Sequence, residues 1–177
     1  MTIHADTHTP DEMRYAIDDS SLGPILVARS NKGISAVLFG DDRDALERDL
    51  RGRFPSAILI DDRATLATFV NRVLAFVDEP ARGLSVPLDL RGSDFQQVVW
   101  ATLREIPPGS TASYTDIAHR IGRPTAVRAV AHACAANALA VVVPCHRVVR
   151  SDGGLSGYRW GIERKRTLLE REREGVA

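Results

Sequence analysis

Apolar positions alternate with polar ones early in the chain and recur at helical spacing further along. Alternation over a few residues is typical of half-buried strands, and a spacing of three or four residues is typical of amphipathic helices. By these patterns the first half holds three strands and two helices, at 13–18, 25–29, 34–39, 43–54 and 64–77. The polar residues 1–12 in front of them are expected to form a flexible leader.

The second half is predicted to be mostly helical. Helices are expected at 94–105, 114–121, 125–136 and 162–172. Asp94 is expected to cap the first of them, and Ser113 with Asp116 three residues later resembles a capping box at the second. Prolines and glycines in between favour a linker. The predicted organisation is therefore an α/β scaffold lobe at 13–79, a linker at 80–92 and a second lobe at 93–177.

The helices at 114–121 and 125–136 are separated by the tight turn Gly122-Arg123-Pro124. Two short helices with a glycine-containing turn have the layout of a helix-turn-helix. In the second helix Arg128 points away from the apolar side, and Ala126, Ala129 and Ala133 are expected to leave the outer face small. Ordinary helix packing is the alternative reading of this pair.

The net charge is zero, but the charges are unevenly distributed. Residues 1–90 carry 10 Lys and Arg against 15 Asp and Glu, and residues 91–177 carry 13 against 8. A basic half indicates contact with a polyanion, although ordinary surface variation explains the difference equally well.

The composition excludes several classes of protein. A hydrophobic content of 44% with 26% charged residues suits a globular domain, and the longest apolar run, 138–144, is too short to cross a bilayer. The chain opens without a secretory signal, and its two cysteines form no disulfide framework. The five histidines have no Cys-x-x-Cys partner, so neither a metal site nor a cofactor is expected.

The run Val141-Val142-Val143 is predicted to be a buried strand that ends at Pro144, because proline cannot donate to a sheet. Cys145 and His146 follow directly. A cysteine beside an imidazole can exist as the thiolate, which is the form that attacks carbon. A buried structural cysteine is the commoner alternative for such a residue.

Three segments together are specific enough to indicate a family. They are Ala135-Ala136-Asn137, Pro144-Cys145-His146-Arg147-Val148-Val149 and, after a glycine-rich loop at 150–157, Gly157-Tyr158-Arg159-Trp160-Gly161. The chain beyond residue 12 resembles the O6-alkylguanine-DNA alkyltransferases, especially the C-terminal domain of the bacterial Ada-type protein. The resemblance implies a ribonuclease-H-like first lobe, with a small antiparallel sheet and helices. It also implies a mostly helical second lobe that contains a helix-turn-helix.

The resemblance also implies a reaction. One alkyl group would pass from O6 of a flipped guanine in duplex DNA, with O4 of thymine as a further candidate, to Cys145 in a single turnover. His146 would take the thiol proton, directly or through a water, and Glu172 would orient His146. Glu170 competes with Glu172 for that role. Tyr114 would donate to a ring nitrogen of the leaving guanine.

Further roles are implied around these residues. Asn137 would tie the second helix to the cysteine loop, main-chain groups of Cys145, Val148 and Arg159 would read the guanine edge, and Tyr158 would wall the pocket. Arg128 would fill the gap left by the flipped base, and Ala126 and Ala129 would allow close approach to the minor groove. Three residues are weaker candidates for phosphate contacts: Thr115, Arg123 and Ser151.

The expected partner is double-stranded DNA that carries O6-alkylguanine, bound by a monomer in the bacterial cytoplasm and at the nucleoid when it acts. The cysteine-rich, zinc-binding domain of Ada-type proteins has no counterpart in this sequence, so the resemblance does not extend to gene activation. The sequence is consistent with a stand-alone repair protein and with one domain of a larger Ada-type regulator. Bulky Trp160 is expected beside the pocket, where it would disfavour large groups such as benzyl. The alternatives are a cysteine hydrolase, a non-enzymatic module that recognises alkylated DNA, and a transcription regulator.

Overall fold

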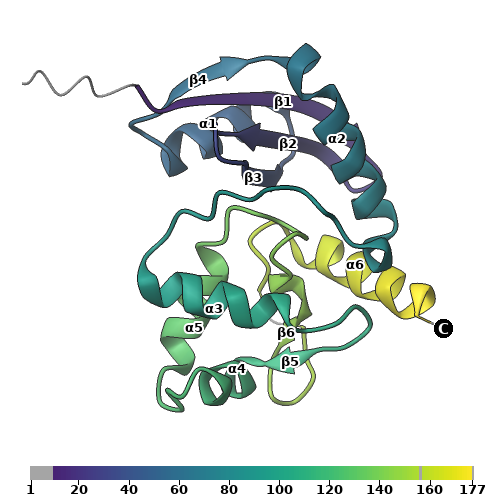
Figure 1. The fold of residues 1–177 in the computed structure, drawn as a ribbon. Coiled ribbons are helices and arrows are strands. Elements are labelled where there is room, and N and C mark those ends of the chain that lie inside the picture. The colour runs from purple at the N-terminus through teal and green to yellow at the C-terminus, as the bar shows by residue number, and fades with distance from the viewer. Residues whose placement is uncertain (1–9, 156, 177) are drawn as a thin grey trace, which may run out of the picture.

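The computed structural model describes residues 10–155 and 157–176, and Figure 1 shows them as two lobes, one above the other. The upper lobe holds a four-stranded sheet and two helices, and the lower lobe holds the remaining helices with a two-stranded sheet. Residues 1–9 of the predicted leader lie outside the described residues, while Glu12 already belongs to the first strand.

The upper sheet has the strand order β3-β2-β1-β4. Its strands are β1 (Glu12–Ser20), β2 (Gly23–Arg29), β3 (Ile34–Phe39) and β4 (Ile58–Asp61). The three predicted strands are confirmed and pair antiparallel, whereas β4 lies parallel to β1. The sequence analysis missed β4 because it is a four-residue edge strand, too short and too exposed to show clear alternation.

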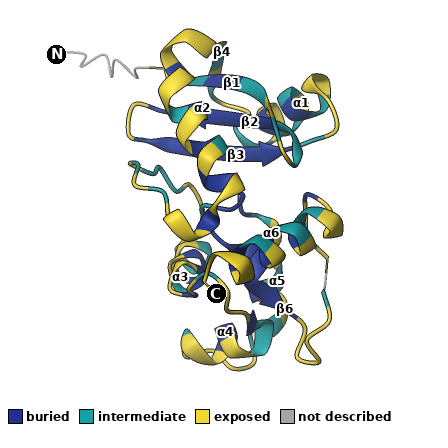
Figure 2. Ribbon diagram, turned by 90° about the vertical axis from the view of Figure 1, so that its right-hand side faces the viewer, coloured by how far each residue is buried: buried dark blue, intermediate teal, exposed yellow. Residues whose placement is uncertain are grey.

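Helices α1 (Arg43–Arg53) and α2 (Arg63–Asp78) confirm the two helices predicted for this lobe. Each begins after an aspartate, since Asp42 accepts a hydrogen bond from the backbone N–H of Ala45 and Asp62 accepts one from Thr65. Such caps satisfy backbone donors that a helix leaves unpaired at its first turn. Figure 2 shows that the sheet they pack against is largely buried.

Strand β3 joins the two lobes, and all six of its residues are buried. Along its outer edge, the Ile34 N–H donates to the Pro87 carbonyl at 2.9 Å, so the linker lies beside it. Further along, the Val37 N–H donates to the Ala138 carbonyl and the Ala140 N–H donates back to the Val37 carbonyl. The edge of the sheet is therefore covered by the segment that leads to Cys145.

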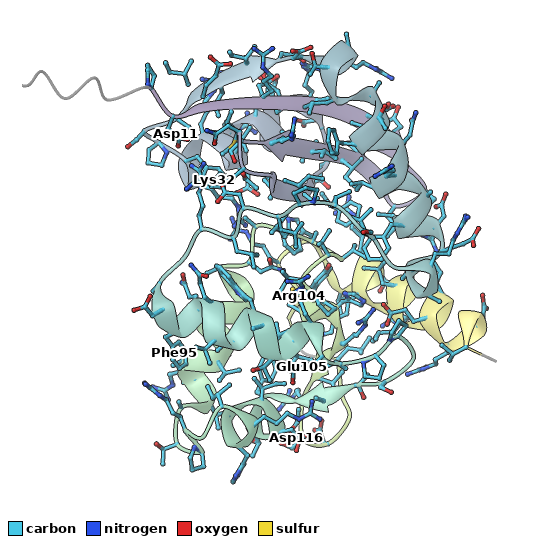
Figure 3. The ribbon with its side chains drawn as sticks, in the orientation of Figure 1. Asp11, Lys32, Phe95, Arg104, Glu105 and Asp116 are labelled. Atoms are coloured by element: carbon cyan, nitrogen blue, oxygen red, sulfur yellow. The ribbon has the colours of Figure 1, made fainter. Side chains whose placement is uncertain are left out.

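Ion pairs also hold the linker in place. Arg91 forms ion pairs with Asp89 and with Asp11, which precedes β1. Figure 3 shows Asp11 and Lys32 near one another at this side of the upper lobe. The start of the sheet and the end of the linker are thus held together before the chain enters the lower lobe.

The lower lobe confirms the four helices predicted for the second half. They are α3 (Asp94–Arg104), α4 (Tyr114–Arg120), α5 (Val127–Ala135) and α6 (Ile162–Gly175). The lobe also contains β5 (Ala112–Ser113), η2 (Cys145–Arg147) and β6 (Val148–Val149), and the linker before it contains η1 (Pro80–Arg82). Ser93 caps α3 in place of Asp94, because its hydroxyl accepts from Gln96 N and the Gln96 side chain accepts from Ser93 N. Strands β5 and β6 pair parallel, which places the start of α4 beside the residues after Cys145.

Two further expectations for this lobe are wrong. Ala133 does not belong to the outer face of α5, since it is 1% exposed and its carbonyl accepts a hydrogen bond from Trp100 Nε1. Residues 141–143 form a turn and not a strand: Val141 has a φ of 68° and the Val143 N–H donates to the Leu139 carbonyl. Their apolar character reflects burial, and a left-handed φ at a β-branched residue indicates a strained backbone just before the cysteine.

Candidate active site

Cys145 is the first residue of η2, and the turn before it fixes its position. The Cys145 N–H donates to the Val143 carbonyl at 2.8 Å, and the Arg147 N–H donates to the Pro144 carbonyl at 2.9 Å. The Cys145 side chain is 5% exposed and lines a cavity of about 400 Å³, which we call the reaction cavity. Its described lining is Tyr114, Ala131, Cys134, Ala135, Cys145, Gly157, Tyr158 and Arg159. A cavity of this size can hold a small ligand.

Asn137 connects the end of α5 to the cysteine loop, where the sequence analysis expected it. Its side-chain oxygen accepts from the Leu139 N–H at 2.8 Å, and its amide nitrogen lies 2.9 Å from the Val143 carbonyl and 3.3 Å from Cys145 Sγ. Asn137 is 1% exposed, so these hydrogen bonds are not exchanged with solvent. The amide therefore holds the turn in shape and donates to the sulfur.

A buried cluster of charged groups lies next to the cysteine. His146 Nε2 is 2.7 Å from Glu172 Oε1, and both side chains are fully buried. Arg147 donates to both carboxylate oxygens of Glu172, at 2.8–3.1 Å, and to the Ile106 carbonyl. Glu170, the competing candidate, is exposed on the other side of α6. The geometry thus pairs Glu172 with His146.

The charges of this cluster define the tautomer of His146. Hydrogen bonds from His146 and Arg147 outweigh burial and lower the pKa of Glu172 to about 2, so Glu172 is a carboxylate at neutral pH. Burial lowers the pKa of His146, which is therefore neutral. Since the carboxylate can only accept, Nε2 carries the imidazole proton and Nδ1 has the free lone pair. His146 Nδ1 is buried and makes no hydrogen bond with the described residues, so it is available to take a proton.

The thiol itself is the resting form of Cys145. Burial raises the pKa of Cys145 and outweighs the hydrogen bond from Asn137, which lowers it. Lys165 is fully buried nearby, with its Nζ 2.6 Å from the Val148 carbonyl, and its positive charge also favours the thiolate of Cys145. A base must therefore remove the proton before the sulfur can attack. Cys134 shares the cavity, and burial also raises the pKa of its thiol.

The two aromatic residues after the glycine-rich loop have different places. Tyr158 lines the reaction cavity, and its ring meets Trp160 edge to face with centroids 5.3 Å apart. Trp160 is buried behind Tyr158 and lines a neighbouring cavity instead of the reaction cavity. Tyr158 thus lies in the wall where it was expected, and Arg159 lines the same cavity, while Val148 is buried and is not part of the described lining. Tyr114 reaches the same cavity from the start of α4.

The residues expected to contact DNA lie on the outer side of α4 and α5. Arg128 and Ala129 are exposed, and Ala126, half-buried, is the residue before α5. Thr115 Oγ1 and Ser151 Oγ are 3.5 Å apart, which puts the start of α4 next to the glycine-rich loop. The guanidinium of Arg123 lies over the ring of Phe95 at 5.7 Å, the residue labelled at the start of α3 in Figure 3. None of these side chains belongs to the described lining of the reaction cavity.

Four charged residues near the site were given no role in the sequence analysis: Asp49, Arg53, Arg147 and Lys165. Lys165 could have been found, because it shares the spacing of the buried Leu168 and Leu169 on α6, and a charge on an apolar stripe is unusual. Arg53 and Asp49 come from α1 of the upper lobe. Arg53 Nη1 donates to the carbonyls of Ala136 and Asn137, both at 3.3 Å.

No cluster of three or more metal-binding side chains occurs in the described part of the chain. None of the described helices combines the length and hydropathy needed to span a bilayer. The site as it stands consists of a thiol, a neutral base with a carboxylate partner, and a cavity lined by tyrosines. This set defines a protein with one cysteine nucleophile that accepts a group from a ligand in the cavity.

Comparison with known proteins gives this class its family. Residues 13–90 match the ribonuclease-like domain of 6-O-methylguanine DNA methyltransferase, and residues 94–174 match its DNA binding domain. The methylated-DNA–protein-cysteine methyltransferase, inducible, of Bacillus subtilis is 42% identical over 92% of this chain and 86% of its own length. The chain belongs to the family of 6-O-methylguanine DNA methyltransferases.

Two further comparisons define its place in the family. The bifunctional transcriptional activator/DNA repair enzyme Ada of Escherichia coli is 52% identical over 92% of this chain, and the chain spans 46% of that relative. The crystal structure of Mycobacterium tuberculosis OGT in complex with DNA superposes with a TM-score of 0.77 and 36% identity, covering 92% of this chain and 94% of that one. The predicted family and the predicted two-lobed mixed fold are therefore confirmed.

Proposed function

We propose that the protein transfers one alkyl group from O6 of guanine in duplex DNA to Cys145 and acts once. In this step a bond forms between Cys145 Sγ and the alkyl carbon, and the bond between that carbon and O6 breaks. The electron pair stays on guanine, which takes up a proton, and the sulfur becomes a thioether. The observation that carries the proposal is a buried thiol at a cavity wall beside a neutral His146 bonded to Glu172.

His146 Nδ1 is the atom that we expect to receive the thiol proton, directly or through a water. Because Nε2 donates to Glu172, the carboxylate stabilises the imidazolium that forms. Arg147 keeps this carboxylate ionised and in place. The side-chain amide of Asn137 provides the positive end of a dipole and Lys165 provides a positive charge, and both stabilise the thiolate.

Tyr114 would stabilise the departing guanine from the opposite wall of the cavity. Its phenol can donate a hydrogen bond to a ring nitrogen on which negative charge develops. Tyr158 would stack against the base or close the cavity beside it, while main-chain groups of Cys145, Val148 and Arg159 would contact the guanine edge. The Val148 carbonyl keeps a second lone pair for this contact, since Lys165 occupies one.

The base must leave the duplex to reach Cys145, because the sulfur is buried. We propose that α4 and α5 form the helix-turn-helix that contacts the DNA, with Arg128 in the gap left by the base. Exposed Ala129 and half-buried Ala126 support close approach of α5 to a groove. Thr115, Arg123 and Ser151 would contact phosphates, and the closeness of Thr115 to Ser151 supports a shared contact. An alkyl group on O4 of thymine is a second candidate for transfer to Cys145 by the same chemistry.

We further propose that the protein acts as a monomer on chromosomal DNA in the bacterial cytoplasm. The Cys145 thiol, the His146 base and the reaction cavity lie within a single chain, so the reaction needs no second subunit. The same set contains no group that would remove an alkyl group from a thioether, which supports a stoichiometric reaction.

The test is to incubate the protein with a duplex that contains one O6-methylguanine and to measure intact and peptide masses. We expect a single added methyl on the peptide that carries Cys145, none on the peptide that carries Cys134, and no second turnover with excess DNA. Cys145→Ser should bind the lesion but slow the transfer by at least about a thousandfold. Methyl on another residue, or release of methanol with repeated turnover, would contradict the proposal.

A further inference from the structure

A second cavity adjoins the reaction cavity. This inter-lobe cavity has a volume of about 520 Å³ and lies where the end of β3 and the start of α1 face the loop before α6. It is lined by Phe39, Gly40, Asp41, Ala45, Asp49, Arg159, Trp160, Gly161 and Arg164. Of the described residues, Arg159 alone lines both cavities. The Arg159 side chain therefore forms the boundary between them.

Asp49 determines where Arg159 lies. Arg159 Nη2 is 3.1 Å from Asp49 Oδ1, across 110 positions of sequence and from the lower lobe to the upper one. The same oxygen accepts from Arg53 Nε at 2.9 Å. Because Arg53 is also bonded to the carbonyls of Ala136 and Asn137, the carboxylate of Asp49 is fixed relative to the reaction cavity.

This ion pair is easily broken. The side chain of Arg159 is 46% exposed and that of Asp49 is 22% exposed. Pairs with this exposure contribute little stability and are weakened by salt. The aromatic pair Tyr158–Trp160 has contacts of its own, since those rings pack against each other, Trp160 is buried, and the guanidinium of Arg53 lies over the Trp160 ring at 5.9 Å. The boundary can thus open while the walls on either side remain.

We propose that Asp49 is a specificity-determining residue for the alkyl transfer. By holding Arg159 across the boundary, it confines the O6 substituent to the reaction cavity, so that methyl is accepted and a benzyl group is excluded. Without this contact the two cavities become continuous, and substituents of benzyl size are accommodated. The inference rests on the proposed function, and it replaces Trp160 by Arg159 as the side chain that meets a large substituent.

The test compares two duplexes that differ only in carrying O6-methylguanine or O6-benzylguanine at one position. Single-turnover rates are measured for the wild type, Asp49→Ala and Asp49→Asn. We expect the ratio of the benzyl rate to the methyl rate to rise about tenfold in Asp49→Ala and less in Asp49→Asn, which keeps an acceptor oxygen. The methyl rate should stay within about threefold of wild type. Asp18→Asn, which breaks an ion pair with Arg63 elsewhere on the same lobe, is the matched control.

An unchanged ratio of the benzyl rate to the methyl rate in both Asp49 variants overturns the proposal. An equal fall of the benzyl and methyl rates also overturns it, because it would mean that Asp49 acts through Arg53 and Asn137. If Asp49 acts through Arg159, then Arg159→Gln and Asp49→Ala/Arg159→Gln should show the same ratio, and a further rise in the double variant would contradict that route. Absence of methyl transfer in the wild type would instead refute the proposed function itself.

Discussion

The two lobes use charged side chains in opposite ways. In the upper lobe most of the described ion pairs lie at the surface, such as Arg63–Asp18 with exposures of 70% and 28%, while Arg53–Asp49 is half-buried at the boundary with the lower lobe. The buried polar side chains described in the upper lobe are Ser30 and Ser35. In the lower lobe Arg147, Lys165 and Glu172 are buried along with His146. Buried charges are costly unless they are paired. The lower lobe is therefore built around its chemistry, and the upper lobe around its apolar core.

The largest loss of stability should come from breaking the buried ion pair between Arg147 and Glu172. Arg147→Met leaves the Glu172 carboxylate buried with His146 alone, and it should lower the free energy of unfolding by about 3–5 kcal/mol in urea denaturation. Arg147→Met/Glu172→Met should recover part of this loss, because no unpaired charge remains. A loss below about 1 kcal/mol for the single variant would mean that the cluster is solvated and that the contrast between the lobes is false.

The pH dependence of unfolding should reveal the same contrast between the two lobes. The pKa of Glu172 is about 2 in the fold against 4.5 when unfolded, so its stabilisation is complete above pH 4.5 and is lost as the pH falls towards 2. The shift corresponds to on the order of 3 kcal/mol. Glu172→Gln removes this titration, and unfolding measured from pH 6 to pH 3 should depend less on pH than in the wild type. Parallel curves for the two proteins would show that Glu172 is not the responsible group.

A charged residue on the surface of the lower lobe should affect methyl transfer from duplex DNA and leave the stability of the fold unchanged. Arg128→Ala removes the exposed side chain proposed to fill the gap of the flipped base, so methyl transfer from duplex DNA should slow by about 10- to 100-fold. The melting temperature should not change. Arg120→Ala, one helix away, is the comparison variant, and an equal slowing there would assign the effect to general loss of positive charge.

The smallest effect belongs to the surface pairs of the upper lobe. Arg63→Gln breaks the ion pair with Asp18 and should change the free energy of unfolding by less than about 1 kcal/mol, with no change in the rate of methyl transfer. A loss as large as that of Arg147→Met would remove the distinction between the lobes.

Local patterns predicted much of the fold. Caps and apolar spacing identified all six helices, and the strands of the hairpins followed from alternation. The strand predicted at 141–143 was wrong, because burial between two lobes requires apolar residues whether the backbone is extended or turned. In the site, adjacency in sequence was enough to pair Cys145 with His146. The contacts of Asp49 and Arg53 could not be predicted, since they join segments about 85 to 110 residues apart that share no local pattern.

The guanidinium of Arg53 has a consequence beyond the cavity. Helix α5 ends at Ala135, and the carbonyls that follow, on Ala136 and Asn137, accept their hydrogen bonds from Arg53 of the upper lobe. A helix end is stabilised by a cation at its carbonyls, so the cap of the helix proposed to contact DNA belongs to a different lobe. Melting of the upper lobe should therefore fray α5 in the same transition, which couples the stability of the first lobe to the helix proposed to bind DNA.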